Sequence, residues 1–144
     1  MGQFWLIIAN ASKARIFEGT SPMGELNEIF EIENESARLQ EKDLVTHGAG
    51  RRHDDGPYGQ KSAMERDPLD VETNNFVREV VRFLEKHRNS GSFESMSIIA
   101  EPRVLGKLRK EMPTSLRALV IEEVSKNVAD QGPEAAQEHL HVLH

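Results

Sequence analysis

The chain has 144 residues, of which 38% are hydrophobic and 29% are charged. This length and composition fit one globular domain whose core needs no cross-links. It contains no cysteine, which excludes a disulfide framework, an iron–sulfur cluster and a cysteine-based zinc site, and which fits a reducing compartment such as the cytoplasm. Its net charge of −6 excludes a basic surface over the whole domain, so nucleic acid could be bound only by a local basic patch.

The first third of the chain predicts three strands. Phe4 to Asn10 is short, continuous and apolar, and no basic region precedes it, so we expect a buried strand and not a signal peptide. After a turn at residues 10–13, Ala14 to Gly19 predicts a second strand that forms a hairpin with the first, and Leu26 to Ile32 predicts a third. Alternation in the third strand predicts one shared face for Leu26, Glu28, Phe30 and Ile32.

A long polar stretch follows, from residue 34 to residue 67. From Thr46 to Asp67 it consists largely of Gly, His, Arg and Asp, with Gly56-Pro57-Tyr58-Gly59-Gln60 near its middle. A loop of this length inside a compact domain is uncommon, and such loops are usually functional or disordered. We therefore expect residues 46–67 to be the working surface of the protein.

The rest of the chain alternates between helices and strands. The pattern predicts helices at Val71 to Asn89, from Pro102 to Pro113 and from Glu134 to about Leu143, and strands at Met96 to Ala100 and Leu119 to Ile121. The order β-β-β-α-β-α-β-α indicates a single α/β domain over residues 1–144, with a mixed five-stranded sheet and crossover helices. No apolar run approaches the ~20 residues of a transmembrane helix, so we expect no membrane partner.

Two segments resemble a known family. Residues 5–17, WLIIANASKARIF, and residues 98–109, IIAEPRVLGKLR, are similar to blocks of the bacterial host attachment protein family. Asn10 departs from the acidic residue expected there in many relatives. That family in turn is similar to the middle domain of archaeo-eukaryotic release factors and of Pelota-like rescue factors. The resemblance implies an RNase-H-like fold and a role linked to the ribosome or to peptidyl-tRNA. The family's name comes from adhesion phenotypes and implies no chemistry.

In release factors the loop before the long helix carries Gly-Gly-Gln, and here the corresponding loop carries Gly59-Gln60. The resemblance implies that these two residues act on the peptidyl-tRNA ester, where a backbone N–H can stabilise the oxyanion and glycine lets the backbone approach closely. Tyr58 stands where the first glycine is expected, so an inert flexible loop is the competing interpretation.

The same loop is a candidate RNA-binding segment. Its basic side chains could contact phosphates and Tyr58 could stack on a base. The candidate RNA-binding residues are Arg51, Arg52, Tyr58, Lys61 and Arg66. Nearby carboxylates, among them Asp54 and Asp55, leave a solvated loop of mixed charge as the alternative.

Other kinds of site have weaker support in the sequence. The histidines and aspartates have no recognised ligand spacing, so we expect no metal and no other cofactor. Arg15 and Arg103 lie in the two family-like blocks and could either line a pocket or be structural.

Two functions of different classes remain open. The first is a cytosolic, translation-associated protein that binds the ribosome or tRNA, and not DNA, with at most a peptidyl-tRNA hydrolase-like activity. The second is a non-enzymatic interaction or regulatory protein that affects host-cell attachment indirectly.

Overall fold

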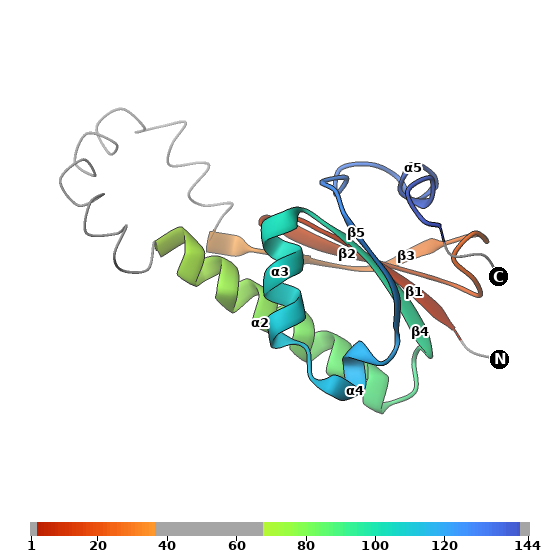
Figure 1. Ribbon diagram of the computed structural model, residues 1–144, viewed down its shortest axis with the longest axis horizontal. Helices are drawn as coiled ribbons and strands as arrows, with labels where there is room; N and C mark the ends of the chain where they lie inside the picture. The colour runs from red at the N-terminus through yellow and green to blue at the C-terminus, as the bar shows by residue number, and fades with distance from the viewer. Residues whose placement is uncertain (1–2, 37–67, 142–144) are drawn as a thin grey trace.

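The computed structural model describes residues 3–36 and 68–141 (Figure 1). Its centre is one five-stranded sheet in the order β3-β2-β1-β4-β5. The strands are β1 (Phe4–Ala9), β2 (Lys13–Gly19), β3 (Asn27–Glu33), β4 (Ser95–Ala100) and β5 (Val120–Ser125). Strand β2 runs antiparallel to β1 and β3, whereas β4 runs parallel to β1 and β5. This confirms the predicted α/β fold with a mixed five-stranded sheet.

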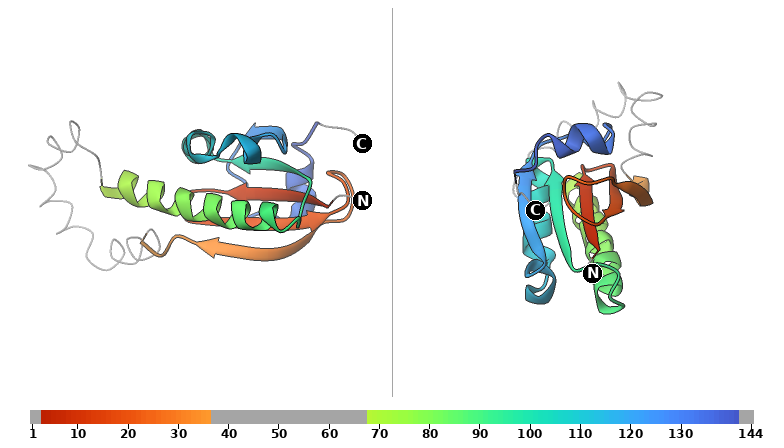
Figure 2. Two further views of the ribbon diagram at one scale, coloured as in Figure 1. Left: turned by 90° about the horizontal axis from the view of Figure 1, so that it is seen from below. Right: turned by 90° about the vertical axis from the view of Figure 1, so that its right-hand side faces the viewer.

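Helices cover the sheet. The described helices are α2 (Pro68–Asn89), α3 (Pro102–Glu111), α4 (Thr114–Arg117) and α5 (Pro133–Gln137). Figure 2 shows α2 running along the length of the sheet. Side chains of α2, α3 and α4 share one hydrophobic cluster with one face of the sheet, and α5 with the chain before it covers the other face.

Strand β1 is buried along its whole length because both of its faces are covered. Trp5 and Ile7 point into the cluster with α2 and α3, whereas Leu6 and Ile8 point into the cluster with α5. A strand in this position needs apolar residues at every position, and not at alternate ones. This explains the continuous apolar run from which the strand was predicted.

The prediction for the faces of β3 is wrong. The pairing of β2 with β3 shifts between Ile16 and Phe17, so that Ile29 is an extra residue in β3, a β-bulge. A bulge inserts one residue and reverses the alternation of faces beyond it. Ile32 therefore packs in the cluster with α2, whereas Leu26 packs in the cluster with α5.

The helices differ from the prediction in three places. Helix α2 begins at Pro68, three residues before the predicted start at Val71. The short helix α4 follows Pro113 and was not predicted. The last helix ends at Gln137, before the predicted end near Leu143, because the chain turns there to bury Leu140 and to place the N–H of His141 on the carboxylate of Glu122.

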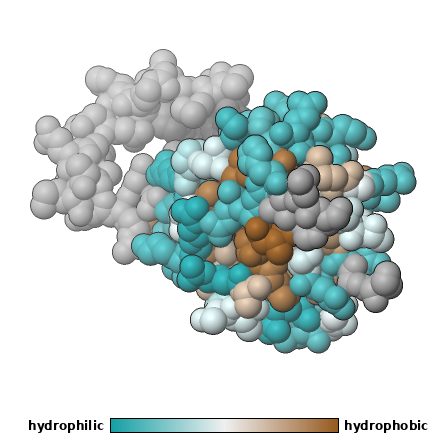
Figure 3. All heavy atoms as spheres, turned by 45° about the vertical axis from the view of Figure 1, so that its right-hand side comes forward, coloured by the Kyte–Doolittle hydropathy of each residue, from teal (hydrophilic) through white to brown (hydrophobic). Residues whose placement is uncertain are grey.

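The surface agrees with the polar composition. Figure 3 shows a face that is mostly hydrophilic, with a patch of hydrophobic residues near its middle. Among the residues that the structure describes, no helix is long and apolar enough to cross a membrane.

Candidate functional site at the carboxyl edge of the sheet

Strands β1, β3, β4 and β5 point in one direction, so their carboxyl ends lie at the same edge of the sheet (Figure 1). Helix α2 begins at this edge and α3 begins directly after β4. In open α/β sheets, ligands bind outside the carboxyl ends of the strands. This edge is therefore the candidate ligand-binding site of the fold.

Asn10 closes the turn between β1 and β2 at this edge. Its side-chain Oδ1 accepts hydrogen bonds from the N–H groups of Ser12, at 2.8 Å, and Lys13, at 2.9 Å. Its own N–H donates to the carbonyl oxygen of Lys13 at 2.9 Å. The side chain thus stabilises the turn, which gives Asn10 a structural role.

Asn34 holds the chain in place just after β3. Its N–H donates to the carbonyl oxygen of Ser12 at 2.7 Å, and its Nδ2 donates to the carbonyl oxygen of Ala11 at 3.0 Å. The side chain is buried, so these bonds are shielded from water. The start of the segment between β3 and α2 is therefore fixed to the β1–β2 turn.

Charges of both signs lie near the strand ends. Lys13 Nζ lies 2.9 Å from a carboxylate oxygen of Asp130, and Lys107 Nζ donates to Oδ1 of Asn74 at 2.7 Å, which joins α3 to α2. Lys126 is exposed at the end of β5. The described part of the edge is therefore mixed in charge and is not by itself a basic patch.

The seven residues predicted to act in catalysis or RNA binding lie outside the described residues and stay predictions. They are Arg51, Arg52, Tyr58, Gly59, Gln60, Lys61 and Arg66. Within residues 3–36 and 68–141, no three histidine or carboxylate side chains gather in a way that could hold a metal ion.

The structure separates the two arginines of the family-like blocks. Arg103 is exposed in the first turn of α3, at the carboxyl edge. Arg15 lies on the face of the sheet that α5 covers. Its Nε and Nη2 donate to the two carboxylate oxygens of Glu28, at 3.1 Å and 2.9 Å, and its Nη1 donates to the carbonyl oxygens of Ala129 and Gln131. Arg15 is thus a structural arginine.

The Arg15–Glu28 pair shifts the pKa of both groups. The hydrogen bonds from Arg15 hold the pKa of the Glu28 carboxyl below its ordinary value, since they stabilise the charged form, although burial acts in the opposite direction. The same bonds raise the pKa of Arg15. The pair therefore stays ionised at neutral pH.

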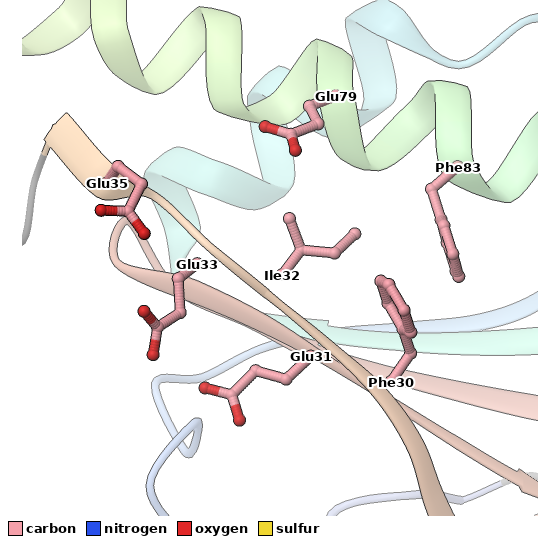
Figure 4. Close-up of a pocket in the computed structure, with 7 residues that line it drawn as sticks. All are labelled: Phe30, Glu31, Ile32, Glu33, Glu35, Glu79 and Phe83. Carbon is pink, nitrogen blue, oxygen red and sulfur yellow. The ribbon is translucent and has the colours of Figure 1, made fainter.

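A groove between β3 and α2 was not predicted from the sequence. It has a volume of about 690 Å³ and combines apolar and acidic side chains (Figure 4). The residues that line it are Phe30, Glu31, Ile32, Glu33, Glu35, Glu79 and Phe83. The one sequence signal was the alternation of glutamate with large apolar residues in β3, and the α2 side of the groove could not be located without the fold.

Residues 5–140 match the model of the family described as "Protein required for attachment to host cells". The "Uncharacterized protein RP470" of Rickettsia prowazekii (strain Madrid E) is 31% identical over 70 residues, which are 47% of this chain and 47% of that protein. The chain thus matches about half the length of this curated relative.

Two solved structures are similar to the described fold. The Ppx/GppA phosphatase of Aquifex aeolicus has a TM-score of 0.44 and 14% identity, over 87% of this chain and 36% of the other. An archaeal translation termination factor, aRF1, has a TM-score of 0.43 and 14% identity, over 94% of this chain and 36% of the other. TM-scores this low support no functional assignment. The family match covers nearly the whole chain, and this chain belongs to the family of proteins required for attachment to host cells.

Proposed function

We propose that this protein is a translation-associated factor that binds the ribosome or peptidyl-tRNA through residues 46–67. The basic side chains Arg51, Arg52, Lys61 and Arg66 would contact RNA phosphates, and Tyr58 would stack on an exposed base. No cofactor is part of this proposal.

The observation that supports it most is where the two ends of this segment are held. Asn34 is tied to the β1–β2 turn, and α2 begins at Pro68 at the same edge of the sheet. The 31 residues between Ser36 and Pro68 therefore leave and rejoin the domain at the edge where α/β proteins bind ligands. A rigid sheet with this attachment is a suitable base for a segment that contacts a large partner.

The proposed activity is hydrolysis of the peptidyl-tRNA ester. Water would attack the ester carbonyl of peptidyl-tRNA, and the negative charge would develop on the carbonyl oxygen. The backbone N–H of Gln60 would stabilise that oxyanion while the ribose oxygen of the tRNA leaves with a proton. Gly59 would let the backbone approach the ester closely, as glycine does in general.

Cosedimentation with purified ribosomes tests the binding step. The wild-type protein is expected in the ribosome pellet, and the double variant Arg51→Ala/Arg52→Ala is expected to be largely in the supernatant, with a weaker dependence on salt. The matched control, Lys110→Ala/Arg117→Ala, also removes two exposed basic residues. Lys110 lies in the last turn of α3 and Arg117 in the last turn of α4, and both are away from the carboxyl edge.

Retention of the wild-type protein in the supernatant at low and at moderate salt would reject ribosome binding. Equal losses in the two double variants would reject the segment as the contact. Release of labelled peptide from stalled ribosomal complexes tests hydrolysis separately. If Gln60→Ala releases peptide as fast as the wild type, the protein binds without catalysis and the hydrolytic step is wrong.

The alternative is a non-enzymatic interaction or regulatory protein. It predicts no ribosome binding at any salt concentration, together with capture of a protein partner. The groove between β3 and α2 is the described feature that favours a protein partner.

A further inference from the structure

The groove between β3 and α2 has an apolar floor. Phe30 of β3 stacks on Phe83 of α2, with ring centroids 4.5 Å apart and planes 13° from parallel. Ile32 lies beside this pair and is buried (Figure 4). Phe30 is nevertheless 45% exposed, which is high for a phenylalanine whose ring already packs on another ring. The floor can therefore bury further apolar surface.

Acidic side chains lie on both sides of β3. Figure 4 shows Glu79 reaching from α2 toward the apolar floor, whereas Glu31 and Glu33 point to the other side of the strand. On that side Lys13 and Arg15 of β2 lie next to β3, but they already form ion pairs with Asp130 and Glu28. The carboxylates of β3 and Glu79 therefore create a local negative potential, which attracts cations and repels phosphates. The chemistry of the groove thus favours a basic ligand with apolar side chains.

Strand β3 is an edge strand, and one side of its backbone faces away from the sheet. It is the last strand of the sheet and pairs, among the described strands, with β2 alone. The N–H of Asn34 points to β2, where it donates to Ser12. Because successive residues of a strand alternate, the backbone groups of Ile32 also face β2, and those of Glu31 point outward. An edge of this kind can accept an added strand.

We propose that β3 and α2 form a docking site for an extended basic segment of a partner protein, which adds to the sheet beside Phe30–Glu33. Side chains on the α2 side of the added strand would be apolar and would cover Phe30 and Phe83. Side chains on the other side would be lysine or arginine and would face Glu31 and Glu33. The site therefore selects an alternating basic and apolar sequence.

Other occupants fit less well. A second copy of this chain would place its own Glu31 and Glu33 against the same residues, and like charges directly opposite one another destabilise paired strands. Nucleic acid would bring phosphates to the same carboxylates.

The bulge at Ile29 limits regular pairing with an added strand to the part of β3 that follows it. The proposal does not depend on ribosome binding.

Titration with a short capped peptide that alternates lysine and valine tests this proposal. Isotope-labelled protein, followed by amide chemical shifts, is expected to show saturable changes at Phe30–Glu33 and at the turns of α2 around Glu79 and Phe83. Amide hydrogen exchange at Glu31 is expected to slow on binding, because its N–H would gain a partner in the added strand.

Charge reversal identifies the site. Glu31 is exposed and so is Glu79, so Glu31→Lys and Glu79→Lys are expected to fold normally and to weaken peptide binding by about tenfold each. Phe30→Ala should also weaken binding, because it removes the floor. The matched control is Glu138→Lys, which makes the same change in net charge at an exposed residue just after α5, outside the groove, and should leave the affinity unchanged.

Several results would overturn the proposal. One is the absence of saturable shifts at β3 and α2 at low ionic strength. Another is an equal loss of affinity in Glu138→Lys, which would mean attraction by net charge alone. A third is equal binding of a peptide in which the same lysines and valines are grouped in two blocks, because such a peptide cannot present the two kinds of side chain on opposite faces of a strand.

Discussion

Arg15 and Glu28 face each other across the β2–β3 pair through two hydrogen bonds, from Nε to Oε2 at 3.1 Å and from Nη2 to Oε1 at 2.9 Å. The remaining Nη1 group reaches the carbonyl oxygens of Ala129 and Gln131, at 2.9 Å and 2.7 Å. The guanidinium also lies over the ring of Phe17, 5.0 Å from its centroid. One side chain thus ties two strands to the chain segment that leads into α5.

Replacing this arginine should destabilise the fold. Arg15→Ala leaves the Glu28 carboxylate and two backbone carbonyls without their donor, so we expect the free energy of unfolding to fall by about 2–3 kcal/mol. Urea unfolding followed by circular dichroism measures the change. The control is Arg78→Ala, since the Arg78–Glu111 pair is longer, at 3.4 Å, and Arg78 is more exposed. That variant should lose less than about 1 kcal/mol. Equal losses would contradict the proposed anchoring role.

The same pair predicts a dependence of stability on pH. Arg15 lowers the pKa of Glu28 in the folded protein, so Glu28 binds its proton more weakly when folded than when unfolded. Its stabilising effect is therefore fully present above the ordinary glutamate pKa and is lost as the pH falls through the lowered, folded-state pKa. The stability advantage of the wild type over Glu28→Gln should be constant near neutral pH and should shrink below about pH 4.

Urea unfolding of both proteins at a series of pH values measures this difference. Glu138→Gln is the control, since Glu138 is an exposed residue just after α5, and its difference from wild type should stay nearly constant with pH. An advantage over Glu28→Gln that is the same at pH 3 and at pH 7 would show that the carboxylate charge is not what stabilises the pair.

The sequence predicted the elements whose signals are local. The apolar run of β1 and the helical spacing of Phe76, Val77, Val80 and Leu84 both predict burial, and all of these side chains are buried. The bulge in β3 was missed because it is defined by the pairing with β2. Its one local signal is the break in alternation at Glu28-Ile29-Phe30, where two apolar residues follow each other.

The candidate sites were harder to predict, because their parts are distant in the sequence. Arg15 donates to the carbonyl oxygen of Gln131, which is 116 residues away in the sequence. Since that contact cannot be found from the sequence, Arg15 could equally have been assigned to a ligand-binding pocket. The groove needs Phe30 and Phe83, which become neighbours only when α2 packs beside β3. By contrast, Gly59-Gln60 was identified only from the resemblance to the Gly-Gly-Gln loop of release factors. Its role stays a prediction, which the ribosome experiments test.

The role of Asn10 leads to a prediction about charge at the carboxyl edge. Its Oδ1 only accepts hydrogen bonds, from the N–H groups of Ser12 and Lys13, and a carboxylate accepts such bonds at least as well. Asn10→Asp should therefore keep the stability of the wild type within about 0.5 kcal/mol, whereas Asn10→Ala should lose about 1 kcal/mol. Thermal unfolding of the three proteins tests this. If Asn10→Asp is as unstable as Asn10→Ala, the acceptor role assigned to the side chain is wrong.

Two glycines should respond to alanine in opposite directions. Gly106 lies inside α3, and a Cβ atom there would meet no heavy atom within 4 Å outside its own helix. Alanine has the higher helix propensity and restricts the unfolded chain, so Gly106→Ala should stabilise the protein by about 0.5–1 kcal/mol. Gly19 ends β2, and a Cβ there would collide with the backbone oxygen of Glu25 and approach Cδ2 of Leu26 to 2.7 Å.

Gly19→Ala should therefore destabilise the protein by about 1–3 kcal/mol, because the clash is with backbone and the chain itself must shift. The two variants make the same chemical change, so each serves as the control for the other in one set of urea titrations. A loss of stability in Gly106→Ala would mean that α3 packs more closely against its neighbours than described. If Gly19→Ala unfolds at the same urea concentration as the wild type, the chain between β2 and β3 can shift to admit the added methyl group without a loss of stability.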